Sequence, residues 1–529
     1  MKEIDYIAEL YRLGRIGRRE FLGRALALGA TGALASTLAG RAVLAAGPKQ
    51  GGTLRVGIGA GSTTDTLDPA TFTDTYMQFV GYALRNHLTE VDTSGKLVPE
   101  LCENWDVSDD AVDWVFNLRK GVEFHNGKTL DANDVVASIN HHRGKDSKSA
   151  AKALLEAIVE IKADGKDKVA ITLREGNADF PYIMSDYHIA IMPAKGDDVD
   201  WKSGVGTGGY VLQSYEPGVR TTFKHNPNYW KEGRAHFDGG EVLAIGDVTA
   251  RTNALNTGEI DVMDRVDLKT VNLLKRNKKL RIEETSGNQQ YTIPMRCDTP
   301  PFDNNEIRLA LKYAVDRAKL LETILRGHGY LGNDHPIGRA NRYFAKELPL
   351  RHYDIDKAKF HLKKAGLSTL KVQLSAADAA FAGAVDAAVL YKEHAAPAGI
   401  DIEVVREPND GYWSNVWLKK PWCMSYWGGR PTEDWMFSTA YAADAPWNES
   451  FWKNDRFNVL LKEARAELDE AKRRAMYVEM QTLVRDDGGE VIPVFANYVF
   501  AMSTKVEHGP MAANWDLDGL KGTERWWFA

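Results

Sequence analysis

The sequence predicts a mixed α/β protein whose chain is divided into two or three lobes. Its 529 residues are too many for one hydrophobic core, because cores stop growing at roughly 250 to 300 residues. Hydrophobic residues make up 44% and charged residues 26% of the chain, which is ordinary for a globular protein, so we expect its body to fold. Strand-like and helix-like stretches follow one another without an internal repeat or a linker rich in Pro, Gly or Ser. We therefore expect the lobes to share strands across their boundary.

The first half of the chain opens on a short strand at 51–57 and continues with a stretch of helical spacing at 76–91. Alternating Trp114, Phe116 and Leu118 predict a half-buried strand. Asn126-Gly127 is a hairpin signal, and Asp131 is a helix cap.

A predicted hairpin follows at 209–224, and the second half shows helical patterns at 303–326, 356–366 and 456–487. The three cysteines are too far apart in the sequence for a zinc or redox motif. Cys297 and Cys423 are the pair to test for a disulfide, but three unpaired buried thiols are the favoured reading.

The first residues read as a targeting segment rather than as part of a lobe. Arg18-Arg19-Glu20-Phe21-Leu22 precedes a weakly apolar stretch of small residues from Ala25 to Ala46, interrupted by Arg41. This arrangement resembles a twin-arginine export signal. We predict a signal over 1–46, cleavage after Ala45 or Ala46, and export to the periplasm. A membrane anchor is the disfavoured alternative, because Arg41 and the glycines and threonines weaken the apolar run. No cysteine occurs in residues 1–50, so we expect no lipid anchor.

Charge and motifs disfavour nucleic-acid binding and catalysis. The net charge is −6, whereas nucleic-acid-binding surfaces are basic, so we expect no nucleic-acid partner. Gly204 to Gly209 has the spacing of a dinucleotide loop, but it follows polar residues and opens into a strand instead of a helix. Neither a G-x-S-x-G elbow nor an H-E-x-x-H pair occurs. We predict no enzymatic activity, no cofactor and no metal site.

Eight motifs in order resemble the extracytoplasmic solute-binding proteins of the peptide and nickel ABC-transporter class, family 5, which includes dipeptide- and oligopeptide-binding proteins. The motifs are Gly51–Arg55, Leu67–Pro69, Pro99–Val136, Gly206–Tyr210, Asn226–Trp230, Gly258–Val262, Pro300–Arg317 and Tyr353–Gly366.

This resemblance implies a type II periplasmic-binding-protein fold, with two α/β lobes around a ligand cleft and an extra subdomain. We expect lobe I at 47–290 with the subdomain at about 90–200, lobe II at 291–491, and a return to lobe I at 492–529. The crossings are expected near Gln290–Thr292 and Ile492–Val494.

The resemblance further implies a monomer that captures a peptide or related amino-acid conjugate by lobe closure and delivers it to ABC permease subunits in the membrane. An opine, a sugar derivative or a metal chelate are alternative ligands within the same fold. A secreted hydrolase and a chaperone-like protein that holds unfolded chains are alternatives from other classes.

The ligand site is expected in the tryptophan-rich segment at 410–452, which holds seven of the fourteen tryptophans. Aromatic side chains suit a cleft that encloses a solute, although we expect about half of them to be packing residues. Residues 426–432 resemble a family segment in which an Asp pairs with the amino group of a bound peptide. Arg430 stands near that position, which favours a ligand with an anionic group. Asp434 could still supply the acid, and pairing of Arg430 with Glu433 or Asp434 is the structural alternative.

In the family, a loop after the Leu-Asp-Pro turn reaches the ligand, and here that loop carries Thr73 and Tyr76. The predicted ligand-binding residues are therefore Thr73, Tyr76, Trp413, Trp427, Arg430 and Asp434.

Overall fold

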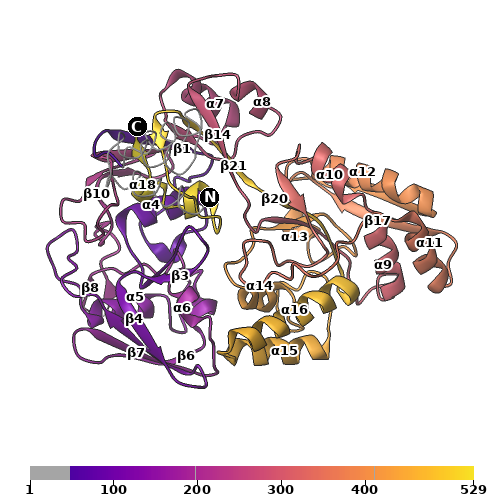
Figure 1. Cartoon of the computed structure of the whole chain (residues 1–529), viewed down its shortest axis with the longest axis horizontal. Helices are drawn as coiled ribbons and strands as arrows, with labels where there is room; N and C mark the ends of the chain where they lie inside the picture. The colour runs from indigo at the N-terminus through magenta and orange to yellow at the C-terminus, as the bar shows by residue number, and fades with distance from the viewer. Residues whose placement is uncertain (1–47, 197, 410) are drawn as a thin grey trace, which may run out of the picture.

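The computed structural model describes residues 48–529 except 197 and 410. The predicted signal segment, residues 1–46, lies outside the described residues. Two lobes stand side by side and are joined by strands that pass between them (Figure 1). In the described part of the chain, no helix is long and apolar enough to cross a membrane.

Lobe I is built on a seven-stranded sheet with the order β10-β11-β12-β1-β13-β21-β14. Its central strand β1 runs parallel to both neighbours and buries Leu54, Val56 and Ile58. Strands β10 and β11 form the predicted hairpin. The strand bounds are β1 Thr53–Ile58, β10 Tyr210–Glu216, β11 Arg220–His225, β12 Gly239–Ala244, β13 Val262–Met263, β14 Leu280–Thr285 and β21 Tyr498–Ser503. Helix α4 (Thr75–Leu84) packs against this sheet.

An antiparallel sheet of the order β4-β5-β7-β6 forms in the region expected for the subdomain. Its strands are β4 Cys102–Val107, β5 Asp113–Leu118, β7 Lys168–Leu173 and β6 Ile158–Ala163. The alternating residues of β5, Trp114, Phe116 and Leu118, are buried, as the sequence pattern predicts. Helix α5 (Ala132–His141) covers this sheet and begins at a capping box formed by Asp131 and Asp134.

Lobe II contains a four-stranded sheet, β16-β20-β15-β19, and a parallel pair, β17-β18. Its strands are β15 Gln290–Pro294, β16 Gly329–Leu331, β17 Leu370–Ala376, β18 Ile400–Arg406, β19 Ser425–Trp427 and β20 Glu490–Ala496. Its longer helices are α9 Asn305–Tyr313, α10 Arg317–Thr323, α11 Ile355–Lys364, α12 Ala384–Ala395, α14 Glu433–Ala440, α15 Asp455–Ala466 and α16 Glu470–Asp487.

Two stretches expected as single helices are each divided. Asp316 separates α9 from α10 and accepts a hydrogen bond from the Lys319 amide, which caps the second helix. Asp469 caps α16 in the same way after the end of α15. An aspartate that binds free amides at a helix start favours beginning a new helix there over continuing the old one.

The chain crosses between the lobes twice. The first crossing lies at 286–289, between β14 of lobe I and β15 of lobe II. The second lies at Asn497, between β20 and β21. Ile492–Val494, where the return to lobe I was expected, instead lies within β20. That strand pairs with β15 and β16 and therefore belongs to lobe II.

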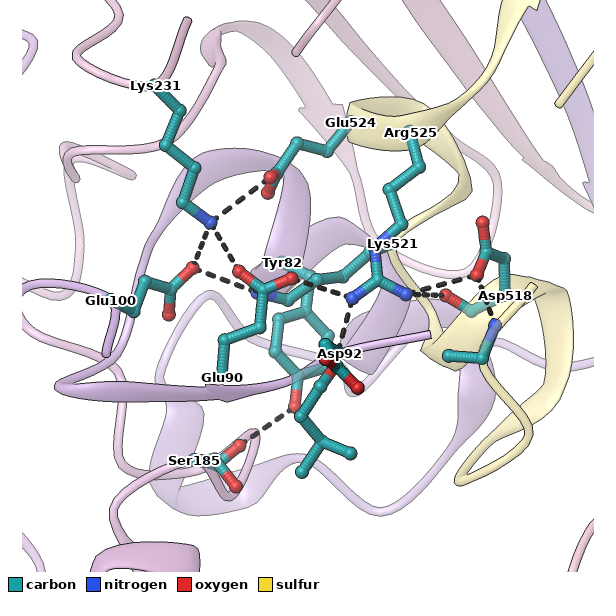
Figure 2. A network of polar contacts seen from close by, with 12 residues as sticks. Tyr82, Glu90, Asp92, Glu100, Ser185, Lys231, Asp518, Lys521, Glu524 and Arg525 are labelled. Carbon is teal, nitrogen blue, oxygen red and sulfur yellow. Dashed lines mark hydrogen bonds and ion pairs between the residues drawn. The ribbon is translucent and has the colours of Figure 1, made fainter. Parts of the chain in front are cut away.

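A buried ionic network fastens the C-terminal segment to lobe I (Figure 2). Lys231 Nζ lies 2.6 Å from a Glu90 oxygen, 2.5 Å from Glu100 and 3.1 Å from Glu524 of α18 (Gly522–Arg525). Arg525 binds the other oxygen of Glu90 at 2.6 Å. Burial opposes ionisation of Glu90, but Lys231, Lys521 and Arg525 outweigh that effect and hold its pKa well below the usual value. The network anchors the segment that follows the second crossing.

The three cysteines carry free thiols, as the favoured prediction has it, and the Cys297–Cys423 pair does not form. Cys102 and Cys423 are buried as expected, whereas Cys297 is only half-buried. Burial raises the pKa of Cys297 to about 11, which keeps its thiol protonated and unreactive at neutral pH.

Candidate ligand-binding site

A cavity of about 2280 Å³ lies between the lobes. It exceeds the roughly 300 to 1,000 Å³ of typical small-molecule sites, so it can hold a peptide-sized ligand together with water. Lobe I and its subdomain contribute residues of the 72–78, 174–188 and 265–269 segments, and lobe II contributes 379–383, 413–417 and 426–447. Residues 496–499 at the second crossing also line it.

Tryptophans form one side of this cavity. Five of the seven in the rich segment line it, namely Trp413, Trp417, Trp427, Trp435 and Trp447, while Trp422 and Trp452 are packed in the core of lobe II. We call Trp413, Trp417, Trp427 and Trp447 the tryptophan wall. Neighbouring rings of the wall have centroids 5.9 to 6.5 Å apart. Trp413 and Trp447 remain 40% and 48% exposed, so their faces are available to a ligand.

Behind the wall lies a buried acid that sequence reasoning missed. Glu449 accepts hydrogen bonds from the indoles of Trp417 and Trp427 and from the hydroxyls of Thr292 and Ser425. With 73 acidic residues in the chain, the sequence carried no signal for this one. Its donors come from separate strands and loops that meet only in the fold.

Arg430 lines the cavity beside the wall. Its guanidinium carbon lies 5.5 Å from the Trp427 ring centroid and 5.9 Å from that of Trp435. Within the described residues, the only hydrogen bond of the Arg430 side chain goes to its neighbour's carbonyl, Gly429 O, at 2.7 Å. Burial lowers the pKa of Arg430, and the nearby Tyr187 and Asp186 partly offset this effect. Arginine remains protonated in proteins, so the cleft contains a cation without a carboxylate partner in the described chain.

The acids expected as structural partners of Arg430 are engaged elsewhere. Glu433 accepts the Tyr343 amide at 2.6 Å. Asp434 lines the cavity, but its carboxylate binds Arg465 at 3.0 Å. The structural alternative for Arg430 is therefore not formed, and Asp434 is partly neutralised as a partner for a ligand ammonium group.

Thr73 lines the cavity, but Tyr76 does not. Asp74 caps α4 and places Tyr76 in its first turn, facing the sheet. The Tyr76 ring is fully buried in the lobe I core, where its hydroxyl donates to Val242 O at 3.2 Å and lies 2.9 Å from the Thr221 hydroxyl. The expectation that Tyr76 contacts the ligand is corrected: its side chain stabilises the lobe.

Lobe I adds residues that the sequence did not single out. Tyr187 and Trp515 line the cavity, and their ring centroids are 5.8 Å apart. Arg265 and Asp516 also line it from lobe I. Burial, reinforced by the charge of Asp264, raises the pKa of Asp516 to about 7. Across the described residues, no cluster of three or more His, Cys, Asp or Glu side chains could hold a metal ion.

Comparisons with known proteins agree with this architecture. The model of the family "Bacterial extracellular solute-binding proteins, family 5 Middle" matches residues 96–449. The chain is 25% identical to the di/tripeptide-binding protein 1 of Pseudomonas aeruginosa over 90% of its own length and 95% of that protein.

Solved structures are similar as well. The periplasmic binding protein AgaA of A. tumefaciens, in complex with agropinic acid, is 23% identical with a TM-score of 0.72, over 90% of this chain and 99% of that one. The periplasmic binding protein DppA of Helicobacter pylori, in complex with the peptide STSA, is 22% identical with a TM-score of 0.73, over 90% and 98%. These structures confirm the predicted two-lobed α/β fold.

Proposed function

Because this chain belongs to the family 5 bacterial extracellular solute-binding proteins, we propose that it captures a peptide or related amino-acid conjugate in the cleft between its lobes and delivers it to an ABC permease. Proteins of this family are transport binding proteins that act outside the cytoplasmic membrane, not enzymes. The ligand would stabilise the closed form of the protein, because some of its contacts form only when both lobes touch it. The monomer is the proposed working unit.

The single observation that carries the choice of ligand is Arg430. A guanidinium offers a planar set of donors that matches a carboxylate, and Arg430 has no carboxylate partner within the described chain. The proposed contacts are Arg430 to a ligand anion, Trp413 and Trp427 to its apolar part, and Thr73 from lobe I. Asp434 lies within reach of the cavity as a secondary, partly neutralised acid.

An opine-like conjugate is the second candidate within this proposal. The same unpaired Arg430 favours it, since such compounds combine amino-acid and carboxylate groups. The relatives span both classes: the Pseudomonas protein is named for di- and tripeptides, and AgaA was solved with agropinic acid.

Calorimetric titration of two matched probes tests the role of Arg430. The tripeptide Ala-Trp-Ala should bind the wild-type protein about tenfold to a hundredfold more tightly than its C-terminal amide, because a charge-assisted hydrogen bond is lost in the amide. Arg430→Ala should remove this preference without unfolding the protein, and Arg430→Lys should restore it only in part.

Arg326→Ala is the matched control, because Arg326 also lines the cavity but is an exposed residue. It should keep the wild-type preference. An Arg430→Ala protein that still prefers the free acid would show that Arg430 does not hold the ligand anion. If neither probe binds the wild-type protein, the peptide assignment itself fails.

We further propose that Arg18-Arg19 directs export by the twin-arginine route, supported by the small, weakly apolar residues that follow. Replacing both with lysine should leave the protein in the cytoplasmic fraction, whereas Arg41→Lys should not. Unchanged periplasmic yield of the double variant in cell fractionation would exclude this route.

A further inference from the structure

Four hydrogen-bond donors converge on the carboxylate of Glu449, which is only 2% exposed. Trp427 Nε1 and Thr292 Oγ1 donate to one oxygen at 2.8 and 2.9 Å. Ser425 Oγ donates to the other oxygen at 2.9 Å, together with Trp417 Nε1. Glu449 forms no ion pair among the described residues, so these donors are its partners in place of a cation.

The chemistry of the donors matches a carboxylate. An indole N–H can only donate, and an ionised carboxylate offers about four acceptor sites on two oxygens. Two donor-only indoles, one on each oxygen, and two hydroxyls therefore match one carboxylate. Burial raises the pKa of Glu449, and its four hydrogen bonds oppose that rise.

The geometry links this acid to the cavity surface. Glu449 accepts the indole N–H of Trp417 and of Trp427, and both residues line the cavity. Trp447, two positions before Glu449 in the chain, packs against both rings, with centroids 6.3 and 6.0 Å away. Ser425 and Thr292 tie the same acid to strands β19 and β15 of the lobe II sheet. Two rings of the tryptophan wall, Trp417 and Trp427, are thus attached through Glu449 to the lobe II sheet.

We propose that Glu449 is a positioning residue that holds the tryptophan wall in place before binding, and that the ligand carries a planar aromatic group that packs against the exposed rings of this wall, Trp413 and Trp447. The inference rests on the proposed function and narrows it to peptides or conjugates with an aromatic part. Rings held in place before binding lose little freedom when they contact a ligand, so stacking translates into affinity.

The first test needs no ligand. Near-ultraviolet circular dichroism reports the packing of tryptophans 6 to 6.5 Å apart. Glu449→Gln keeps the shape but has one acceptor oxygen and an NH₂ group that faces donors, so the tryptophan bands should weaken clearly. The matched control is Glu490→Gln. Glu490 is also buried in lobe II, but it accepts from Tyr441 at 3.0 Å and not from the wall. Its tryptophan bands should stay at the wild-type level.

The second test compares Ala-Trp-Ala with Ala-Ala-Ala by calorimetry. The wild-type protein should bind Ala-Trp-Ala about tenfold more tightly or better, from burial and stacking of the indole. In Glu449→Gln this ratio should fall to about threefold or less, with the affinity for Ala-Ala-Ala little changed. Trp417→Phe, which removes one donor and keeps an aromatic ring, should give a smaller loss and serves if Glu449→Gln does not fold.

The outcomes separate this inference from the proposed function. Equal binding of both tripeptides by the wild-type protein would overturn the aromatic ligand class while leaving peptide capture intact. Binding of neither tripeptide would overturn peptide capture, and the dichroism would still decide the role of Glu449. Wild-type bands and an unchanged affinity ratio in Glu449→Gln would show that the acid is structural only.

Discussion

At the scale of single residues, Asp516 is a buried acid in the cavity surface whose charge is poorly compensated. It accepts the Leu517 amide at 2.7 Å, and burial together with the nearby Asp264 raises its pKa to about 7. In the unfolded chain the pKa of an aspartate is about 3.9. Between about pH 4 and pH 7 unfolding therefore releases a proton from Asp516, and this residue destabilises the fold increasingly as the pH rises.

Asp516→Asn should remove this pH dependence. The free energy of unfolding of the variant minus that of the wild type should be near zero at about pH 4, grow by about 1 kcal/mol per pH unit, and level off above about pH 7. Urea denaturation at a series of pH values measures it. Asp386→Asn, at an exposed acid of the same cavity, should change stability by about 0.5 kcal/mol or less. A difference that is flat with pH would contradict an elevated pKa for Asp516.

Single residues also set the limit of sequence reasoning about the site. Two separate motifs predict that the loops carrying Thr73 and Arg430 reach the ligand site. In the structure both loops line the cavity. The motif before Thr73 does not predict the side of α4 on which Tyr76 lies. That side depends on where the helix begins, which the Asp74 cap determines. Glu449 and Asp516 had no signal, because their partners are distant in sequence.

At the scale of elements, periodicity predicts helices well but not their divisions. Apolar spacing continues across Asp316 and Asp469, so 303–326 and 456–487 each read as one helix, whereas the structure begins a new helix at each aspartate. The capping preference of aspartate was the available signal.

The glycines at 204–209, by contrast, are interpreted correctly from the sequence that surrounds them. A Cβ at Gly208 would lie 2.4 Å from the Leu84 carbonyl carbon, so this glycine allows a loop to pack on the end of α4. The structure supports reading these glycines by their context, since Tyr210 begins strand β10 and not a helix.

At the scale of the whole molecule, the lobes touch along an edge away from the two crossings. The Asp179 carboxylate, just before α6 (Phe180–Ile183) of the subdomain, lies 2.6 Å from the Arg473 guanidinium of α16. The Ala178 amide donates to Arg465 O at 2.7 Å. In Figure 1 this edge is where α15 and α16 approach the subdomain. No sequence pattern predicts such a pair, because its members lie in different lobes and meet only in this arrangement of the two.

Asp179→Asn should shift the molecule towards separated lobes. Asp179 and Arg473 are 5% and 3% exposed, and an unpaired buried arginine is costly unless opening returns it to water. Arg473 keeps its hydrogen bond to Ala464 O within lobe II, so the lobe itself should stay folded. We expect a larger radius of gyration by small-angle X-ray scattering and about tenfold weaker binding of Ala-Trp-Ala, because part of the binding energy must now close the lobes.

Lys462→Met breaks an exposed pair with Glu175 across the same edge, at 3.6 Å, and should change neither quantity. Scattering identical to that of the wild type, with undiminished affinity, would mean that the Asp179–Arg473 pair does not hold the lobes together.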